Sequence, residues 1–267
     1  MAQAELIAPD ALSSLADAVV LDCRLSLSDP GLGRSDYAAG HVPGAHYLHL
    51  NEDLSGPPGE HGGRHPLPDP QAFAARLASF GVGMTTAVVA YDDNRLAFAA
   101  RLWWLMRSLG YRPPRLLDGG FAAYLAAGGE VETEVPVATP CEIPEVGTFT
   151  GYCDIDGLRD LQRQSALVID SREERRYQGL EEPIDPVAGH IPGAINRPWQ
   201  GVTDGEGVAR DTDGQREHWG DAVEAEKLVV YCGSGVTACV NLFSLALLDR
   251  EDATLYAGSW SDWCSYL

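Results

Sequence analysis

Basic residues are scarce in this chain of 267 residues, and Lys227 is its single lysine. The 19 lysines and arginines stand against 39 aspartates and glutamates, so the formal net charge is -20. Proteins that bind nucleic acids or anionic lipids use clusters of basic side chains to neutralise phosphates. The composition therefore argues against a nucleic-acid partner and against a membrane surface.

The chain also lacks an apolar run of the 18 or more residues that indicate a membrane-spanning helix. Its first residues, MAQAELIAPDALSSLADAVVLDCR, show no basic region followed by an apolar one, which is the pattern of a secretion signal. With 45% hydrophobic residues, the composition is typical of a globular protein large enough for two domains. We expect a cytoplasmic enzyme.

Cysteine pairs at metal-binding spacing are missing as well. The six cysteines form no C-x-x-C motif, and the histidines form no cluster beside them. Structural zinc is therefore not expected. In a chain of this size without a secretion signal, free thiols are the ordinary state, and most of them are buried and inert.

What the sequence does contain is an internal repeat. AVVLDCR at 18–24 returns as ALVIDSR at 166–172, and AGHVPGAH at 39–46 returns as AGHIPGAI at 188–195. In the same order, AVVAYDDNRLAFAARL at 87–102 matches LVVYCGSGVTACVNL at 228–242, and LLDGGFAAY at 116–124 matches LYAGSWSDW at 255–263. Motifs that recur in one order indicate a duplicated domain.

In both halves, short runs of Val, Ile and Leu alternate with helical periods, as in βαβ units. The predicted class is α/β, with two tandem domains that each hold a mainly parallel sheet covered by helices on both faces. Asp69 before Pro70 predicts the start of one helix. Residues 128–151, rich in Pro, Gly and Glu, have no period. We place the domains at 1–130 and 152–267, with a linker at 131–151.

Cys232 lies between an apolar run and a glycine-containing turn. Residues 228–231 predict a strand, and apolar residues at helical spacing predict a helix over 236–248. Ligands bind at the carboxyl ends of strands in α/β sheets, and Gly233 and Gly235 allow successive N–H groups to turn inward around an anion. Such a turn stabilises a thiolate, so Cys232 is the candidate nucleophile. The alternative is a tight turn with a buried thiol.

The sequence argues against two other interpretations of this turn. GSGVTA at 233–238 fits the dinucleotide-binding pattern G-x-G-x-x-A, but only about 30 residues follow, too few for the strands that such a domain adds. A cysteine phosphatase needs an arginine six residues after its cysteine to bind the phosphoryl oxygens. That position is Ala238.

The repeat, together with GHIPGA, CGSGVTA and GSWSDW, resembles the tandem rhodanese-type sulfurtransferases over nearly the whole chain, and the loop is most similar to that of 3-mercaptopyruvate sulfurtransferases. The resemblance implies that Cys232 accepts a sulfane sulfur as a persulfide and passes it to cyanide, a thiol or a thioredoxin-like acceptor, without a cofactor. The persulfide is then held by the loop residues Gly233, Ser234, Gly235, Val236, Thr237 and Ala238. Asp92 takes the place of the cysteine in the first domain, which is expected to be catalytically silent and to line the cleft with GRHPLP at 63–68.

A few side chains near Cys232 indicate which sulfur donor is preferred. Thiosulfate-preferring relatives carry basic residues after the cysteine, where this chain has Gly233 and Ser234, so we expect 3-mercaptopyruvate, with thiosulfate as the alternative. The hydroxyl of Ser234 is a candidate for binding the ketone or moving a proton. Arg176 matches the family's carboxylate-binding arginine.

The family's second arginine is replaced by Ile184, and Arg95 and Arg197 are the candidates to compensate. This departure keeps a third possibility open, a sulfur carrier with little turnover.

Overall fold

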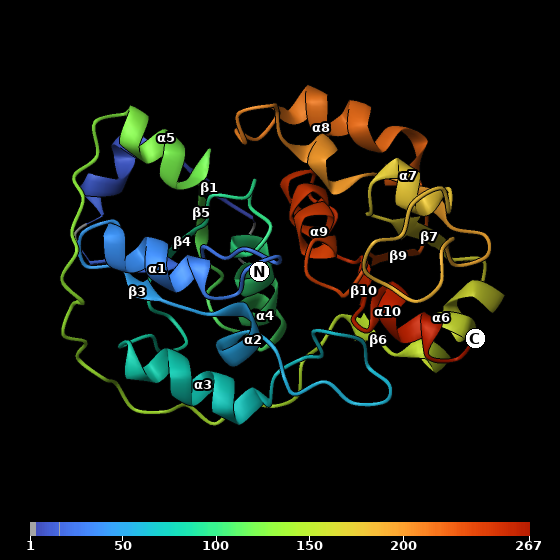
Figure 1. The fold of residues 1–267 in the computed structure, drawn as a ribbon, viewed down its shortest axis with the longest axis horizontal. Helices are drawn as coiled ribbons and strands as arrows, with labels where there is room; N and C mark the ends of the chain where they lie inside the picture. Colours follow the sequence, from blue (N-terminus) through green and yellow to red (C-terminus); the bar gives the residue numbers. More distant parts are fainter. Residues whose placement is uncertain (1–3, 16) are drawn as a thin grey trace. The chain divides into compact units, whose positions relative to one another are not determined.

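The computed structural model describes residues 4–15 and 17–267, which form two compact units (Figure 1). The first unit comprises the chain up to Gly56, Pro68–Thr150 and Gly205–Ala209. The second comprises Pro57–Leu67, Gly151–Asp204 and Arg210–Leu267. Two short segments thus fold outside their linear order, and residues 57–67, which contain GRHPLP in large part, belong to the second unit.

Each unit is built on a parallel sheet, five-stranded in the described residues, and the two sheets have the same topology. The strand orders are β1-β5-β4-β2-β3 and β6-β10-β9-β7-β8. This confirms the α/β prediction. The strands are β1 Leu6–Ile7, β2 Val19–Asp22, β3 His46–Tyr47, β4 Val88–Tyr91, β5 Arg115–Leu117, β6 Tyr152–Cys153, β7 Leu167–Asp170, β8 Ile195–Asn196, β9 Leu228–Tyr231 and β10 Thr254–Tyr256.

Helices connect the strands in both units. In the first they are η1 Pro9–Ser14, α1 Leu32–Ala39, α2 Leu50–Asp53, α3 Pro70–Ser79, α4 Ala99–Ser108 and α5 Gly120–Ala126. In the second they are α6 Ile155–Arg163, α7 Glu174–Tyr177, η2 Trp199–Val202, α8 Thr212–Trp219, η3 Gly220–Glu224, α9 Ala238–Leu247 and α10 Ser259–Cys264. Among the described residues, no helix combines the length and the apolar character needed to cross a membrane.

The repeat has a buried electrostatic counterpart at equivalent strand ends. In the first unit, Arg24 bonds to Asp22 at 2.7 Å and to the carbonyl of Gly40 at 2.7 Å, and the hydroxyl of Tyr91 donates to Asp22 at 2.6 Å. In the second, Arg172 bonds to Asp170 at 2.7 Å and Gly189 at 2.6 Å, and Tyr231 donates to Asp170 at 2.6 Å. Because the set occurs in both units while only one carries a cysteine in the loop, its role is structural.

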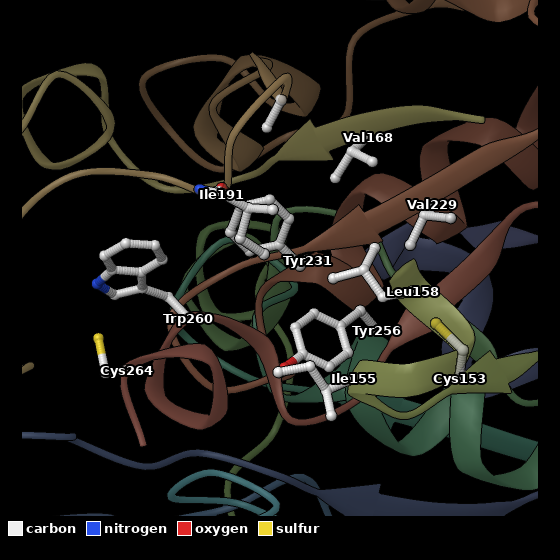
Figure 2. Close-up of a cluster of buried hydrophobic side chains, with 11 residues drawn as sticks. Cys153, Ile155, Leu158, Val168, Ile191, Val229, Tyr231, Tyr256, Trp260 and Cys264 are labelled. Carbon is white, nitrogen blue, oxygen red and sulfur yellow. Dashed lines mark hydrogen bonds between the residues drawn. The ribbon is translucent and has the colours of Figure 1, made fainter. Parts of the chain in front are cut away.

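The core of the second unit surrounds the strands that carry the site (Figure 2). Leu158 of α6 is completely buried and packs with Val168 of β7 and Val229 of β9, while Tyr231, Tyr256 and Trp260 extend the cluster. The removal of apolar side chains from water is the main favourable contribution to such packing. The packed strands form a rigid base for the turn that follows β9.

The predicted start of α3 and the predicted extent of β9 are confirmed, and the start of α9 differs from the prediction. Asp69 begins α3 as its N-cap, accepting from the N–H of Ala72 at 2.8 Å, and β9 covers residues 228–231 as predicted. Helix α9, however, begins at Ala238 rather than at 236. The residues before it form tighter turns, in which the N–H groups of Cys239 and Val240 reach carbonyls three residues back.

Candidate functional site

The backbone around Cys232 is held by the first turn of α10. The N–H of Cys232 donates to Ser259 Oγ at 3.2 Å, and its carbonyl accepts from the N–H of Trp260 at 3.0 Å. The carbonyl of Gly233 accepts from Ser261 at 2.9 Å. These bonds engage the first two carbonyls of the loop with α10 and fix the end of β9 on which the sulfur sits.

Ser259 is a supporting residue that our sequence analysis did not identify. Its backbone φ is 58°, in the left-handed region that residues other than glycine rarely adopt. Besides accepting from Cys232, its hydroxyl donates to the carbonyl of Tyr256 at 3.0 Å. The GSWSDW repeat pointed to this turn, but only the folded chain shows that the serine holds the cysteine backbone.

The equivalent loop of the first unit shows how such a turn receives an anion. The buried carboxylate of Asp92 accepts the N–H groups of Asn94 at 2.9 Å, Leu96 at 3.1 Å, Phe98 at 2.9 Å and Ala99 at 2.9 Å. Burial raises the pKa of Asp92, and these four backbone bonds oppose the rise. The loop is thus an anion site with its own carboxylate inside.

In the second unit, the repeat assigns the corresponding N–H groups to Ser234, Val236, Ala238 and Cys239, of which the N–H of Cys239 donates to the carbonyl of Val236 at 3.0 Å. The loop candidates lie together in this turn: Gly233, Ser234, Gly235, Val236 and Ala238 are buried, and Thr237 is half-buried. Cys232 itself is 1% exposed. A thiol at the start of a loop whose counterpart binds a carboxylate is an arrangement suited to a bound sulfur anion.

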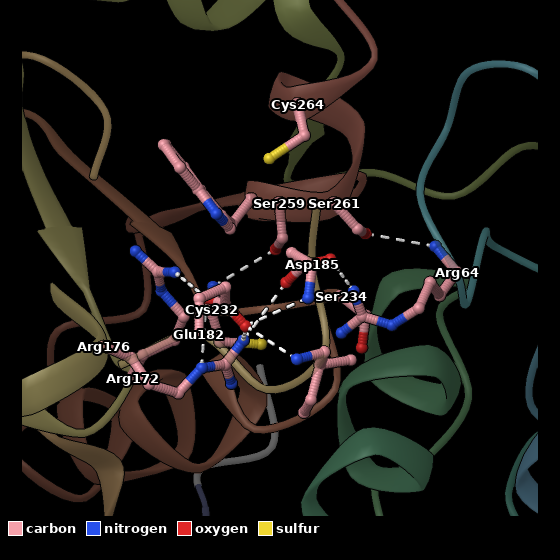
Figure 3. Close-up of polar contacts among 12 residues, drawn as sticks. Arg64, Arg172, Arg176, Glu182, Asp185, Cys232, Ser234, Ser259, Ser261 and Cys264 are labelled. Carbon is pink, nitrogen blue, oxygen red and sulfur yellow. Dashed lines mark hydrogen bonds and ion pairs between the residues drawn. The ribbon is translucent and has the colours of Figure 1, made fainter. Parts of the chain in front are cut away.

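Two guanidinium groups, those of Arg64 and Arg176, lie near Gly233, and Figure 3 draws both side chains together with Cys232. A Cβ placed on Gly233 would lie 3.2 Å from Nη2 of Arg64 and 3.5 Å from Nη1 of Arg176. Arg176, the candidate from the sequence for binding the donor carboxylate, comes from α7, whereas Arg64 comes from the 57–67 segment. Glycine at 233 leaves room for both groups directly beside the cysteine.

Buried carboxylates hold the two arginines from their other edges. Arg176 bonds to Glu182 at 2.7 Å and to Asp185 at 3.1 Å, and Arg64 forms an ion pair with Asp185. Glu182 also contacts Arg172 at 3.1 Å, which joins this cluster to the Asp170–Arg172 pair of the fold. The side chains of Glu182 and Asp185 are 3% and 2% exposed.

The resulting network contains three arginines and three carboxylates: Arg64, Arg172, Arg176, Asp170, Glu182 and Asp185. Burial lowers the pKa of Arg64, the proximity of Cys232 opposes this, and the charge of Arg176 adds to the lowering. A balanced network of this kind suits a donor with one negative charge better than a dianion.

A second polar pair lies beside the loop. The hydroxyl of Ser234 is 2.7 Å from Nδ1 of His65, so the imidazole and the hydroxyl share a hydrogen bond. Ser234 does not cap the following helix, whose N-cap is Thr237. A hydroxyl in contact with a titratable imidazole can exchange a proton through it.

The second guanidinium near Gly233 belongs to neither Arg95 nor Arg197. Arg197 uses its guanidinium on backbone carbonyls, with Trp219 at 3.3 Å and Asn196 at 2.9 Å, and Arg95 belongs to the first unit. Ile184 is half-exposed in the turn closed by Glu182. Arg64 is the arginine that joins Arg176 at the loop. The sequence analysis named 63–68 as a cleft-lining segment of the first domain but did not single out Arg64.

Burial disfavours the thiolate form of three of the other five cysteines. All six are free thiols, and burial raises the pKa of Cys23, of Cys264, and of Cys153 to about 12. Within residues 4–15 and 17–267, no group of three or more His, Cys, Asp or Glu side chains is arranged to hold a metal ion.

Comparison with known proteins gives the family. The rhodanese-like domain matches residues 8–127 and again residues 155–266. The chain belongs to the rhodanese family. It is a sulfurtransferase with two tandem rhodanese-like domains, as the sequence predicted.

Its relatives include proteins named for two donors. A probable 3-mercaptopyruvate sulfurtransferase of Pseudomonas aeruginosa is 41% identical, covering 98% of this chain and 96% of that protein. A putative thiosulfate sulfurtransferase of Mycobacterium tuberculosis is 37% identical over 92% of this chain and 87% of that protein. The solved 3-mercaptopyruvate sulfurtransferase from Leishmania major is 30% identical, with a TM-score of 0.86 over 99% of this rhodanese and 75% of that chain.

Proposed function

We propose that this rhodanese transfers sulfur from 3-mercaptopyruvate through a persulfide on Cys232 to a thiol or cyanide. The observation that carries the proposal is the combination beside one cysteine of a buried loop that repeats the anion-binding loop of the first unit, two arginines held in a charge-balanced network, and a hydroxyl bonded to an imidazole. 3-Mercaptopyruvate carries one carboxylate, a ketone and a transferable sulfur, and each matches one of these groups. A thioredoxin-like acceptor and a cytoplasmic location remain predictions of the sequence.

The first half-reaction balances without an added oxidant. The Cys232 thiolate attacks the donor sulfur, an S–S bond forms, and the C–S bond of the donor breaks. The electron pair of that bond passes to the carbon as an enolate, which takes up a proton and leaves as pyruvate. A thiol acceptor or cyanide then attacks the outer sulfur and regenerates the Cys232 thiolate.

The surrounding residues stabilise the charge that moves in this step. Ser234 can donate its hydrogen bond to the developing enolate oxygen while His65 supplies or takes the proton. The loop N–H groups receive the negative charge of the terminal persulfide sulfur, as the first-unit loop receives the Asp92 carboxylate. Arg176 binds the donor carboxylate.

Intact-mass measurement tests the proposal. Wild type and Cys232→Ser are exposed to 3-mercaptopyruvate or thiosulfate, and cyanide-dependent thiocyanate release is followed in parallel. We expect one added sulfur on wild type alone, formed faster from 3-mercaptopyruvate, with steady turnover. Faster labelling by thiosulfate would make it the donor, labelling without turnover would indicate a sulfur carrier, and no labelling would refute the persulfide.

A further inference from the structure

Arg64 lies in a segment that is fixed to α10 at several points. The N–H of Gly62 donates to Asp262 at 2.7 Å, the N–H of Arg64 donates to Ser261 Oγ at 3.1 Å, and His61 bonds to Ser265 at 2.7 Å. Gly63 has a φ of 79°, and a Cβ there would overlap the carbonyl oxygen of Gly258. The backbone carrying Arg64 is thus held against the same helix that holds Cys232.

The orientation of the two guanidinium groups is complementary. Arg64 uses Nη1 for Asp185 and directs Nη2 to Gly233, while Arg176 uses Nε and Nη2 for Glu182 and Asp185 and brings Nη1 to Gly233. Asp185 contacts both arginines and so sets the spacing between them (Figure 3). Each group therefore keeps one nitrogen for its buried partner and presents another beside the cysteine.

We propose that Arg64 is a donor-binding residue, and that together with Arg176 it binds the carboxylate of 3-mercaptopyruvate while Asp185 keeps the two guanidinium groups at the required spacing. This inference rests on the proposed function and assigns to residue 64 the second guanidinium that Ile184 cannot supply. Binding by two planar groups also orients the carboxylate, since each N–H has a defined direction.

The charge balance of the network explains why it binds a donor with one carboxylate rather than a donor with two negative charges. Arg64 and Arg176 are already balanced by Asp185 and Glu182 in this cluster. The donor gains directed hydrogen bonds from the two nitrogens near Gly233, but no large net positive charge faces it. Arg64 thereby contributes to the choice between donors.

The test compares two donors that differ only at the carboxylate. Mercaptoacetone keeps the thiol and the ketone of 3-mercaptopyruvate and has a methyl group in place of the carboxylate. Loss of a hydrogen bond to a charged group costs about 10- to 100-fold. Arg64→Gln should lower kcat/KM for 3-mercaptopyruvate by about that factor, chiefly through KM, and change mercaptoacetone less than about twofold.

Two further variants separate binding from folding. Arg64→Lys keeps the charge without the planar fork, so it should recover part of the loss. Arg64→Gln leaves the carboxylate of Asp185 with one partner fewer. The double variant, Arg64→Gln with Asp185→Asn, removes this carboxylate as well, and it should show the same dependence on the donor. Arg175→Gln is the matched control, because Arg175 is exposed and bonds to Glu181 at 2.9 Å. An equal loss for both donors, or no loss for either, would overturn the proposal.

A binding measurement keeps this inference distinct from the proposed function. Pyruvate is titrated calorimetrically into Cys232→Ser with and without Arg64→Gln. We expect the affinity to fall about 10-fold or more with the second change. Equal affinity, or no binding to Cys232→Ser, would exclude Arg64 whatever the turnover, whereas failure of wild type to form a persulfide would refute the proposed function alone.

Discussion

At the scale of single residues, the two loops differ in the side chain that directly follows the strand. Asp92 follows β4 and fills its own loop with a carboxylate, while Cys232 follows β9 with a thiol. In the proposed function, the second loop holds the outer sulfur of a persulfide instead. The carboxylate reaches four N–H groups from a fixed position. A persulfide has one more atom than a thiol, and that atom brings negative charge to the same kind of turn.

We predict that Asp92→Asn destabilises the first unit by about 1–3 kcal/mol. The asparagine amide keeps one acceptor oxygen, but its NH₂ group faces backbone N–H groups that donate to the carboxylate in the wild type. The amide group and these N–H groups are buried. The midpoint of urea unfolding should fall accordingly. Glu134→Gln, at an exposed position of the same unit, is the control and should leave the midpoint nearly unchanged. Equal midpoints for the two variants would contradict this role for Asp92.

The sequence predicted some residues of the candidate site and missed others for a physical reason. Cys232 and Arg176 occur in local motifs whose residue types carry their own chemistry. The other site residues bond to partners far along the chain: Arg64 to Ser261, 197 positions away, His65 to Ser234, 169 positions away, and Ser259 to Cys232, 27 positions away. Such partners are set by tertiary packing, so the segment 57–67 could not be assigned to the second unit before the fold was known.

At the scale of elements, the turn between β9 and α9 is shaped by its glycines and by α10. Gly235 has a φ of 78°, and a Cβ there would overlap the carbonyl oxygen of Ala257. The strand was predictable from four consecutive buried apolar residues. The start of α9 was not, because the tight turns at Val236 and Thr237 depend on this close approach rather than on the apolar stripe.

Gly235→Ala should therefore disrupt the loop. An alanine in the left-handed region costs about 1–2 kcal/mol, and overlap with a backbone oxygen adds to that cost. Gly193→Ala is the matched control, since Gly193 has a φ of 83° with nothing within 4 Å of a Cβ. Thermal unfolding should show a loss for Gly235→Ala at least about twice that of Gly193→Ala. Persulfide formation should be impaired in the first variant alone, and similar losses would count against the close approach.

On the scale of the whole molecule, duplication preserved the fold and changed the loop. Both units keep the Asp–Arg–Tyr set at the ends of their central strands. The periodic repeat made this architecture predictable, because each motif returned in the same order. The buried acids in these sets are paired with arginines, so the excess of negative charge lies elsewhere in the chain.

That excess predicts how stability responds to salt. With a net charge of -20, the folded chain repels itself, and compaction brings the charges closer than they are in the unfolded chain. Raising the ionic strength from about 0.01 M to about 0.15 M shortens the screening length from about 30 Å to about 8 Å, which weakens this repulsion. The melting temperature should rise by several degrees, equally in NaCl and KCl of the same ionic strength. A fall would mean that exposed ion pairs such as Arg34–Glu52 outweigh the repulsion, because screening weakens attraction between surface charges as well.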